Sequence, residues 1–434
     1  MGYRDIYKES NEQAEERFSL VMERIAEIAE ETDVPEKFDD YFKKTAAFLL
    51  QLKNVSEKAE KDTLKDASLT ECEKQNAGFY DDIKAENYGK SYGNPTYAVE
   101  KLGEEYGQIL SALYAECRKR ITDVYAAKKM NVTITAELFV EIYNYFEDKE
   151  GIDKTAIEQA VYWYFHDYSE IFIGDSVREL VDSEEDFLYQ IVMNSDLNDL
   201  RYLYQYGQHI GKNETGIAAF LNGMSDEEIQ AMADTYTEGY RIGFAATGKD
   251  LSKKTTAQVR YPIGFERMVR AAVKNLEKLN LKVTMRACSS AANKQYDYDH
   301  KEDKALYYDK AYVERRLEVM KTSFEEMKKL ANGQAGPAVI EVFGEIPFSP
   351  ETKKEVLKLD EKQQQLSVYD MSMSGQITNQ YIIGEERSFT IIAYPVPEIG
   401  EKFEEIFAET VKINTLDYTL YQNMQQKIID VLDQ

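Results

Sequence analysis

The first half of the chain carries apolar side chains at helical spacing. Between residues 95 and 130 they recur every three or four positions, which places them on one face of a helix. These positions are Val99, Leu102, Tyr106, Ile109, Leu113, Cys117, Ile121 and Val124. Asn94 is suited to cap this helix and Pro95 to stand at its first position. The same spacing predicts helices over residues 11–30, 35–52, 136–146, 154–171 and 225–244, whereas the polar stretch 57–91 is predicted to be partly irregular.

The second half alternates short β-prone runs with helical ones. Strands are predicted over residues 255–261, 281–285, 337–343 and 388–394, and helices over 265–279, 311–330, 353–366 and 401–434. This alternation is typical of a layered α/β domain, here expected to be Rossmann-like. Gly243 and Gly248 interrupt the helical spacing close to the point where alternating strands and helices begin. The sequence therefore predicts an α-helical N-terminal domain over 1–247 followed by an α/β domain over 248–434.

Composition and charge narrow the classes of function. The chain has 434 residues, of which 43% are hydrophobic and 30% charged, as in globular proteins. Its 53 basic and 79 acidic side chains give 53 − 79 = −26, which argues against nucleic acid and anionic membranes as partners. There is no apolar N-terminal signal and no run long enough to span a bilayer. Three dispersed cysteines without a C-x-x-C pair favour a cytoplasmic protein with reduced thiols.

The segment Gly243–Asp250 nearly matches the phosphate-loop pattern G-x-x-x-x-G-K-[ST]. Asp250 stands where a hydroxyl should ligate Mg²⁺, and the segment follows a predicted helix instead of a strand. We therefore interpret it as a glycine helix stop and a polar linker. Nucleotide binding through Lys249 is the alternative, and it requires saturable binding that is lost in Lys249→Ala.

A second candidate is the run QYDYDHKED, whose oxygen and nitrogen donors could hold a divalent ion. The possible ligands are Asp297, Asp299, His300 and Asp303. As a calcium loop the run fails, because Glu302 stands at the sixth position, where glycine is required, and Tyr308 stands at the twelfth. We interpret it as a solvated loop and a helix N-terminal turn.

The remaining candidates have simple structural interpretations. His166 lies in an aromatic helical run and His209 in a polar turn, and neither has metal-ligand spacing. No G-x-S-x-G elbow occurs. The chain is rich in tyrosine, and many of its tyrosines fall on predicted helices, for which core packing is one interpretation and a subunit interface another. They include Tyr143, Tyr145, Tyr162, Tyr164, Tyr202, Tyr204 and Tyr206.

Several longer runs resemble a known family. Residues 293–321, 335–351 and 386–407, the last with the strand followed by YPVP, look like the N-terminal α/β part of thermophilic-type metalloaminopeptidases of the aminopeptidase T and S kind. Residues 94–108 and 193–207 resemble the extra helical region of the larger clostridial leucyl aminopeptidases. The resemblance covers most of the chain.

The resemblance implies removal of N-terminal residues from peptides by two divalent ions of zinc, cobalt or manganese. The family's ligands include a His-x-Asp pair in its C-terminal half, and none of the three histidines here belongs to such a pair. We therefore assign no catalytic, cofactor-binding or metal-binding residue and expect this chain alone to be inactive. It is expected to be the non-catalytic N-terminal region of such an enzyme, a homo-oligomer with peptides as partners. A stand-alone binding or scaffold protein derived from the enzyme is the alternative.

Overall fold

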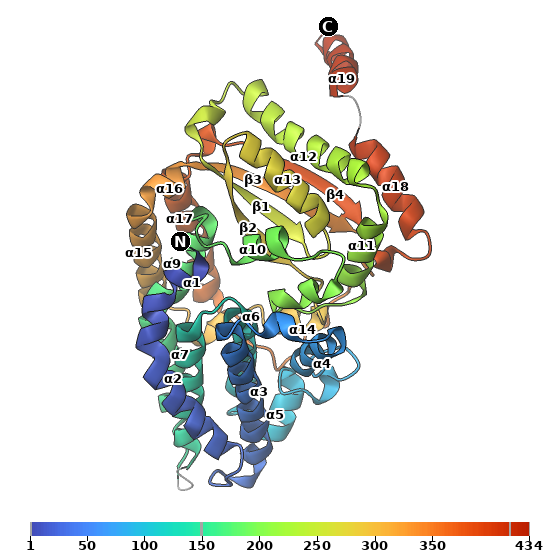
Figure 1. Cartoon of the computed structure of the whole chain (residues 1–434). Coiled ribbons are helices and arrows are strands. Elements are labelled where there is room, and N and C mark those ends of the chain that lie inside the picture. The colour runs from blue at the N-terminus through green and yellow to red at the C-terminus, as the bar shows by residue number, and fades with distance from the viewer. Residues whose placement is uncertain (1, 148–150, 416–417, 434) are drawn as a thin grey trace.

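The N-terminal third of the protein is a bundle of helices. The computed structural model describes residues 2–147, 151–415 and 418–433. Four long helices lie side by side in the lower part of Figure 1, namely α2 (Lys8–Ile28), α3 (Glu36–Glu60), α6 (Gly107–Tyr125) and α7 (Lys129–Glu147). Shorter helices complete the bundle, namely α1 (Tyr3–Ile6), α4 (Leu69–Tyr80), α5 (Pro95–Leu102) and α8 (Lys154–Asp167). Its aromatic core includes Phe38, Phe42, Phe139 and Phe146.

Two helices replace the one predicted over residues 95–130. Asn94 accepts a hydrogen bond from the backbone of Thr96 and Pro95 opens α5, as the sequence indicates. Helix α5 ends at Gly103, which has a φ of +88°, a backbone conformation that would be strained for a residue with a Cβ atom. A new helix, α6, begins at Gly107. The prediction of one continuous helix is therefore wrong, because apolar spacing persists across a break in the backbone.

A parallel sheet of four strands forms the upper part of the molecule in Figure 1. The strands are β1 (Thr256–Pro262), β2 (Lys282–Cys288), β3 (Gln334–Phe343) and β4 (Thr390–Pro395), in the order β2–β1–β3–β4. Helices α12 (Asp226–Ala246) and α13 (Glu266–Lys278) cover one face. Val259 lies opposite Met285 and Ala338 and is fully buried there. The predicted succession of a helical region and an α/β region is confirmed at this level.

The core beneath α12 and α13 also includes residues of earlier helices. These are α10 (Phe187–Asn194) and α11 (Lys212–Gly223), which join the later helix α18 (Phe403–Asn414) around the sheet. Residues 191–244 thus share a core with strands that begin at residue 256. The domain division at residues 247 and 248 stays a prediction.

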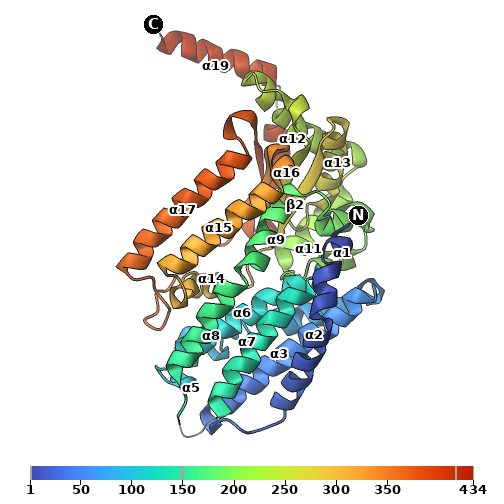
Figure 2. The same cartoon turned by 90° about the vertical axis from the view of Figure 1, so that its left-hand side faces the viewer.

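A third cluster of helices stands beside the sheet. It comprises α9 (Ser169–Val181), α15 (Lys310–Glu326), α16 (Lys328–Asn332) and α17 (Glu361–Tyr381), with α15 and α17 side by side in Figure 2. The helix predicted over residues 353–366 is confirmed from residue 361 onward, but its predicted start is wrong. Helix α17 begins only after Asp360, whose side chain and that of Gln363 form a capping box, and residues 344–360 are not helical.

The second face of the sheet is only partly covered. Near the start of the strands, the carbonyl oxygen of Leu180 at the end of α9 accepts hydrogen bonds from Thr284 and Gln334. Toward β4 this face is open: Phe389 is 64% exposed and Ile391 is 54% exposed. Parallel sheets are normally buried on both faces, so these apolar side chains mark an unpartnered surface of the described chain.

Two smaller elements complete the description. Helix α14 (Lys294–Asp299) follows Asn293, whose side chain donates to the carbonyl oxygen of Ile83, and α19 (Tyr418–Leu432) projects from the body in Figures 1 and 2. The helical character predicted over residues 401–434 is confirmed by α18 and α19 for the residues that the structure describes there. Among the described residues, no helix combines the length and the apolar character that crossing a membrane requires.

Candidate functional site

Helix α6 carries a row of four charged side chains, of which Lys119 alone is exposed over about half of its side chain. Lys119 and Arg120 follow Glu116 by three and four positions, and Asp123 follows them by four and three, so that each lies within contact of the next along the helix. Lys119 Nζ lies 2.9 Å and Arg120 Nη2 3.3 Å from the Glu116 carboxylate, and Arg120 Nη1 lies 2.8 Å from Asp123 Oδ2. Glu116 and Arg120 are buried. The row is therefore an ionic network that folding has largely withdrawn from water.

Helix α9 and the turn between α6 and α7 extend this network. Asp175 accepts a hydrogen bond of 3.2 Å from Asn131 and lies 3.7 Å from Lys128 Nζ. Lys128, which is buried, also donates to Glu179. Four carboxylates, of Glu116, Asp123, Asp175 and Glu179, thus face three cations in one region.

A cavity of about 350 Å³ opens to solvent between α6, α9 and the start of α15. Charged groups of the network line one part of it, and aromatic rings of Phe165, Phe172, Tyr307 and Tyr312 line another. Two buried atoms of its wall, Arg120 Nε and Ser169 Oγ, have no hydrogen-bond partner among the described residues. A buried donor without a partner is costly, so the hydrogen-bonding capacity of both atoms is left unused by the described protein groups.

The pKa shifts of the carboxyls show how far neighbouring cations stabilise the negative charges of this network. Burial raises the pKa of the Asp123 carboxyl, although Arg120 and Lys128 oppose the rise. Burial likewise raises the pKa of Asp175 against the effects of Lys128 and Asn131. For Glu116, burial acts upward too, but Lys119 and Arg120 outweigh it and lower the pKa. Perturbed acids in a cleft are typical of binding and catalytic sites.

Sequence reasoning missed this site, although one signal for it was present. The apolar stripe of residues 113, 117, 121 and 124 predicts one buried face for α6. Arg120 lies seven positions after Leu113 and four before Val124, so it falls on the same face as this stripe, and a charge among apolar positions is the signal for a buried ionic site. The structure buries Glu116 and Arg120 together with the stripe.

The phosphate-loop candidate has no phosphate-binding geometry. Gly243 lies inside α12, and the helix continues to Ala246, so the interpretation of Gly243 as a break is wrong. Gly248, with a φ of +66°, follows the helix end as a stop. Lys249 Nζ donates to the carbonyl oxygen of Arg387 at 2.6 Å, which ties the segment to the approach of β4.

The acidic run around α14 is a structural joint. Asp299 is buried and accepts hydrogen bonds from Tyr88 Oη at 2.7 Å, from Gln295 and from Lys353 Nζ at 2.5 Å. The ring of His300 lies 2.7 Å from Asp303 and 2.6 Å from the carbonyl oxygen of Gly93. The interpretation as a solvated loop is therefore wrong for Asp299 and His300. Their donors and acceptors are occupied by protein groups and fix α14 to residues 88–94.

The other candidate side chains remain dispersed. His166 pairs with the adjacent Asp167, and His209 approaches the carbonyl oxygen of Ser290 at 3.2 Å. Burial lowers the pKa of His209. Cys117 is buried as predicted, and all three cysteines are free. Five of the seven singled-out tyrosines are buried, which is ordinary core packing: Tyr143, Tyr164, Tyr202, Tyr204 and Tyr206.

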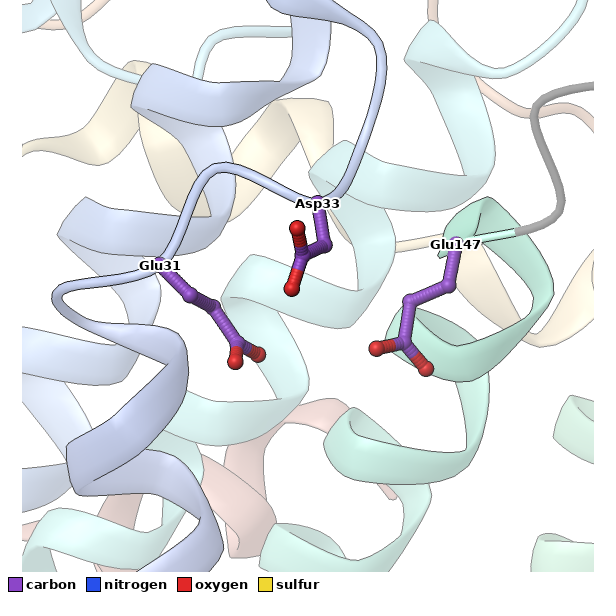
Figure 3. Close-up of side chains that lie close together, drawn as sticks. All are labelled: Glu31, Asp33 and Glu147. Carbon is purple, nitrogen blue, oxygen red and sulfur yellow. The ribbon is translucent and has the colours of Figure 1, made fainter.

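Three carboxylates converge at the far end of the bundle (Figure 3). Glu31 and Asp33 come from the α2–α3 connection and Glu147 from the end of α7, and one ligand atom of each lies within 4.8 Å of the others. Arg24 donates to Glu31 and to Glu147, both at 3.0 Å. Because the protein's own guanidinium neutralises two of the three acids, the cluster is better explained as a salt-bridge network than as a metal site.

A wider cavity, of about 1130 Å³, lies between the bundle and the sheet region, where α3 and α4 face α10. Its wall holds charges that are exposed and already paired, such as Lys65 with Asp62 and Arg201 with Asp199. It offers a wide groove without the unsatisfied buried groups of the α6–α9 cavity. The smaller cavity is therefore the better candidate for a specific ligand.

Comparisons of the chain with protein-family models, with curated proteins and with solved structures find no match.

Proposed function

We propose that the chain is the non-catalytic N-terminal region of a metal-dependent, leucyl-type aminopeptidase, with the catalytic half outside this sequence. In this proposal the sheet region is a Rossmann-like domain that packs beside the catalytic half. The assembled enzyme is a cytoplasmic homo-oligomer that acts on peptides, and its two divalent ions of zinc, cobalt or manganese belong to the other half. The basis is the sequence resemblance of residues 293–321, 335–351 and 386–407.

One structural observation supports the proposal, namely the open face of the parallel sheet. Phe343, Phe389 and Ile391 are exposed there by 40%, 64% and 54%. The adjacent strands place Arg260 directly opposite Arg286, and no carboxylate of the described residues forms an ion pair with either. Apolar and basic groups left open on a chain of net charge −26 suit an acidic protein surface that packs over them.

The nucleotide sequence after codon 434 tests the proposal first. A reading frame that continues into Glu, His and His-x-Asp segments supports it. A stop codon followed by an unrelated gene contradicts it and favours the alternative of a stand-alone binding or scaffold protein.

The activity assay then tests the role of the sheet face. The chain alone is expected not to hydrolyse leucine p-nitroanilide with zinc, cobalt or manganese, and metal-dependent turnover would refute the proposal. In the extended protein, Ile391→Asp should reduce this activity by weakening the contact between the two halves. Leu20→Asp is the matched control, because Leu20 is 59% exposed on the distant helix α2 and its substitution should leave activity unchanged.

The alternative function also has an observation in its favour. Met424, Ile428 and Val431 lie at helical spacing on α19 and are 55%, 61% and 71% exposed. An unpartnered amphipathic helix of this kind is suited to docking in a groove of another protein. The stand-alone scaffold therefore predicts that removal of residues 418–434 abolishes partner binding while the folded body persists.

A further inference from the structure

The cavity between α6 and α9 presents both signs of charge at close range. Arg120 and Lys128, which are buried, and Asp123 and Asp175 all line this space of about 350 Å³. Pockets of this size accept a small organic molecule. A ligand that satisfies both sides must itself carry a cation and an anion.

The cavity wall offers hydrogen-bond donors without a partner to the anionic end of such a ligand. Two nitrogens of the Arg120 guanidinium are occupied by Glu116 and Asp123, and the third, Nε, is buried without a partner. Ser169 is 2% exposed, and its hydroxyl is also without a partner among the described residues. Both side chains line the cavity. One carboxylate could accept from a guanidinium N–H and a hydroxyl, a pairing in which charge strengthens both hydrogen bonds.

For the cationic end of the ligand the cavity offers carboxylates whose negative charge the protein stabilises only in part. Lys128 lies 3.7 Å from Asp175, which is an ion-pair distance but too long for a hydrogen bond. Burial raises the pKa of both Asp123 and Asp175, which means that water and neighbouring cations do not fully stabilise their charge. An ammonium group placed between these two carboxylates would supply the missing positive charge.

Another part of the cavity wall is aromatic. The rings of Phe165 and Tyr307 stack with centroids 3.7 Å apart, and the Arg120 guanidinium lies 5.0 Å from the centroid of Phe172. An apolar substituent packs favourably against such rings. The cavity thus combines two charged ends with one apolar side.

We propose that this cavity binds a free α-amino acid with an apolar side chain. Its carboxylate is bound by Arg120 Nε and Ser169 Oγ, its ammonium by Asp123 and Asp175, and its side chain by Phe165, Phe172 and Tyr307. All of these residues belong to the helical bundle, α9 and the approach to α15, and none lies on the sheet face. The proposal therefore stands apart from the proposed aminopeptidase role, and either one can fail without the other.

The first test is isothermal titration calorimetry of the full chain with L-leucine and L-phenylalanine. Saturable binding at one molecule per chain is expected. Leucinol, which lacks the carboxylate, and 4-methylpentanoate, which lacks the ammonium, should each bind at least about tenfold more weakly, since each loses charge-assisted hydrogen bonds. Binding of leucinol as tight as that of leucine, or no binding of either amino acid, would overturn the proposal.

Substitutions then locate the site. Ser169→Ala should weaken leucine binding about tenfold, because its hydroxyl would donate to a charged carboxylate. It removes no hydrogen bond within the protein, so its fold should be retained in circular dichroism. Ser111→Ala is the matched control, since Ser111 is equally buried and unpartnered but lies outside the cavity. Asp175→Asn should weaken binding of leucine but not of 4-methylpentanoate. Unchanged affinity in both Ser169→Ala and Asp175→Asn would refute the assignment.

Discussion

Glu266 makes the stability of the sheet region depend on pH. This residue lies at the start of α13, just after β1, and is fully buried. Its Oε2 accepts from Tyr202 Oη at 2.8 Å and from the backbone N–H of Gly264 at 2.9 Å, while its Oε1 has no partner among the described residues. Burial raises the pKa of Glu266 from an ordinary 4.5 to about 7, against the effect of these hydrogen bonds.

The sign of the effect follows from the order in which the two states lose their proton. As the pH rises above 4.5, this carboxyl ionises first in the unfolded chain, which stabilises the unfolded state. In the folded protein it stays protonated until about pH 7. The folded state is therefore favoured at low pH and loses stability between these values. The interval from 4.5 to about 7, at ~1.36 kcal/mol per pH unit, corresponds to a loss of about 3 kcal/mol.

Urea unfolding at pH 5 and pH 8, followed by circular dichroism, measures this loss. Glu266→Gln cannot ionise, so its free energy of unfolding should fall by about 3 kcal/mol less than that of the wild type over the interval. The comparison between two pH values cancels the cost of placing an amide at this site. Tyr202→Phe removes a donor to the carboxylate and should enlarge the loss. Identical pH dependence in the wild type and Glu266→Gln would refute the reasoning.

Three further predictions concern packing and burial. Gly336 has a φ of +108°, and a Cβ there would lie 2.0 Å from a neighbouring carbonyl oxygen, so Gly336→Ala should destabilise by at least about 2 kcal/mol in urea unfolding. Gly375 lies on α17 with open space where a Cβ would be, so Gly375→Ala should instead stabilise the fold by about 0.5–1 kcal/mol. A lower free energy of unfolding in Gly375→Ala would contradict this difference between the two glycines. Asp299→Ala removes the ion-pair partner of Lys353, whose side chain is 10% exposed and keeps its hydrogen bond to Asn94, and should cost about 3 kcal/mol in urea unfolding; an unchanged stability would contradict this. Cys117 is fully buried and should react with a thiol reagent only after the chain unfolds, whereas the exposed Cys288 of β2 should react in the native state. Mass spectrometry of the labelled peptides measures both reactions, and labelling of Cys117 in the native state would contradict the prediction.

Much of the secondary structure could be predicted, because local spacing determines it. The four strands lie where runs of β-prone residues occur. The capping box at Ser225 marks the start of α12, and the N-cap Asn94 followed by Pro95 marks the start of α5. The errors fall at positions where apolar periodicity gives no information. The break at Gly103 and the late start of α17 at Asp360 depend on backbone geometry and capping, which override a continuous apolar pattern.

Most of the candidate site could not be predicted from the sequence. The acidic run at residues 297–303 is dense in metal-ligand types, yet Asp299 and His300 are hydrogen-bonded to Tyr88, Gly93 and Lys353, which lie 54–211 positions away. Conversely, Arg120 lies on the apolar face of α6, but the groups of α9 that join it in the cavity are far along the chain. Which charges remain unsatisfied depends on which distant groups surround them, and that is a property of packing alone.

The sequence by itself determined the helical first half, the alternation of strand and helix in the second, and the strongly acidic charge, because these depend on neighbours within a few positions. Only the tertiary structure decided the strand order β2–β1–β3–β4, the open sheet face and the cavity that joins Arg120 and Ser169. Strand order and burial arise from contacts between residues far apart in the chain. The same contacts remove water from a charge or leave it exposed, and so they determine which of the many ionisable groups can bind a ligand.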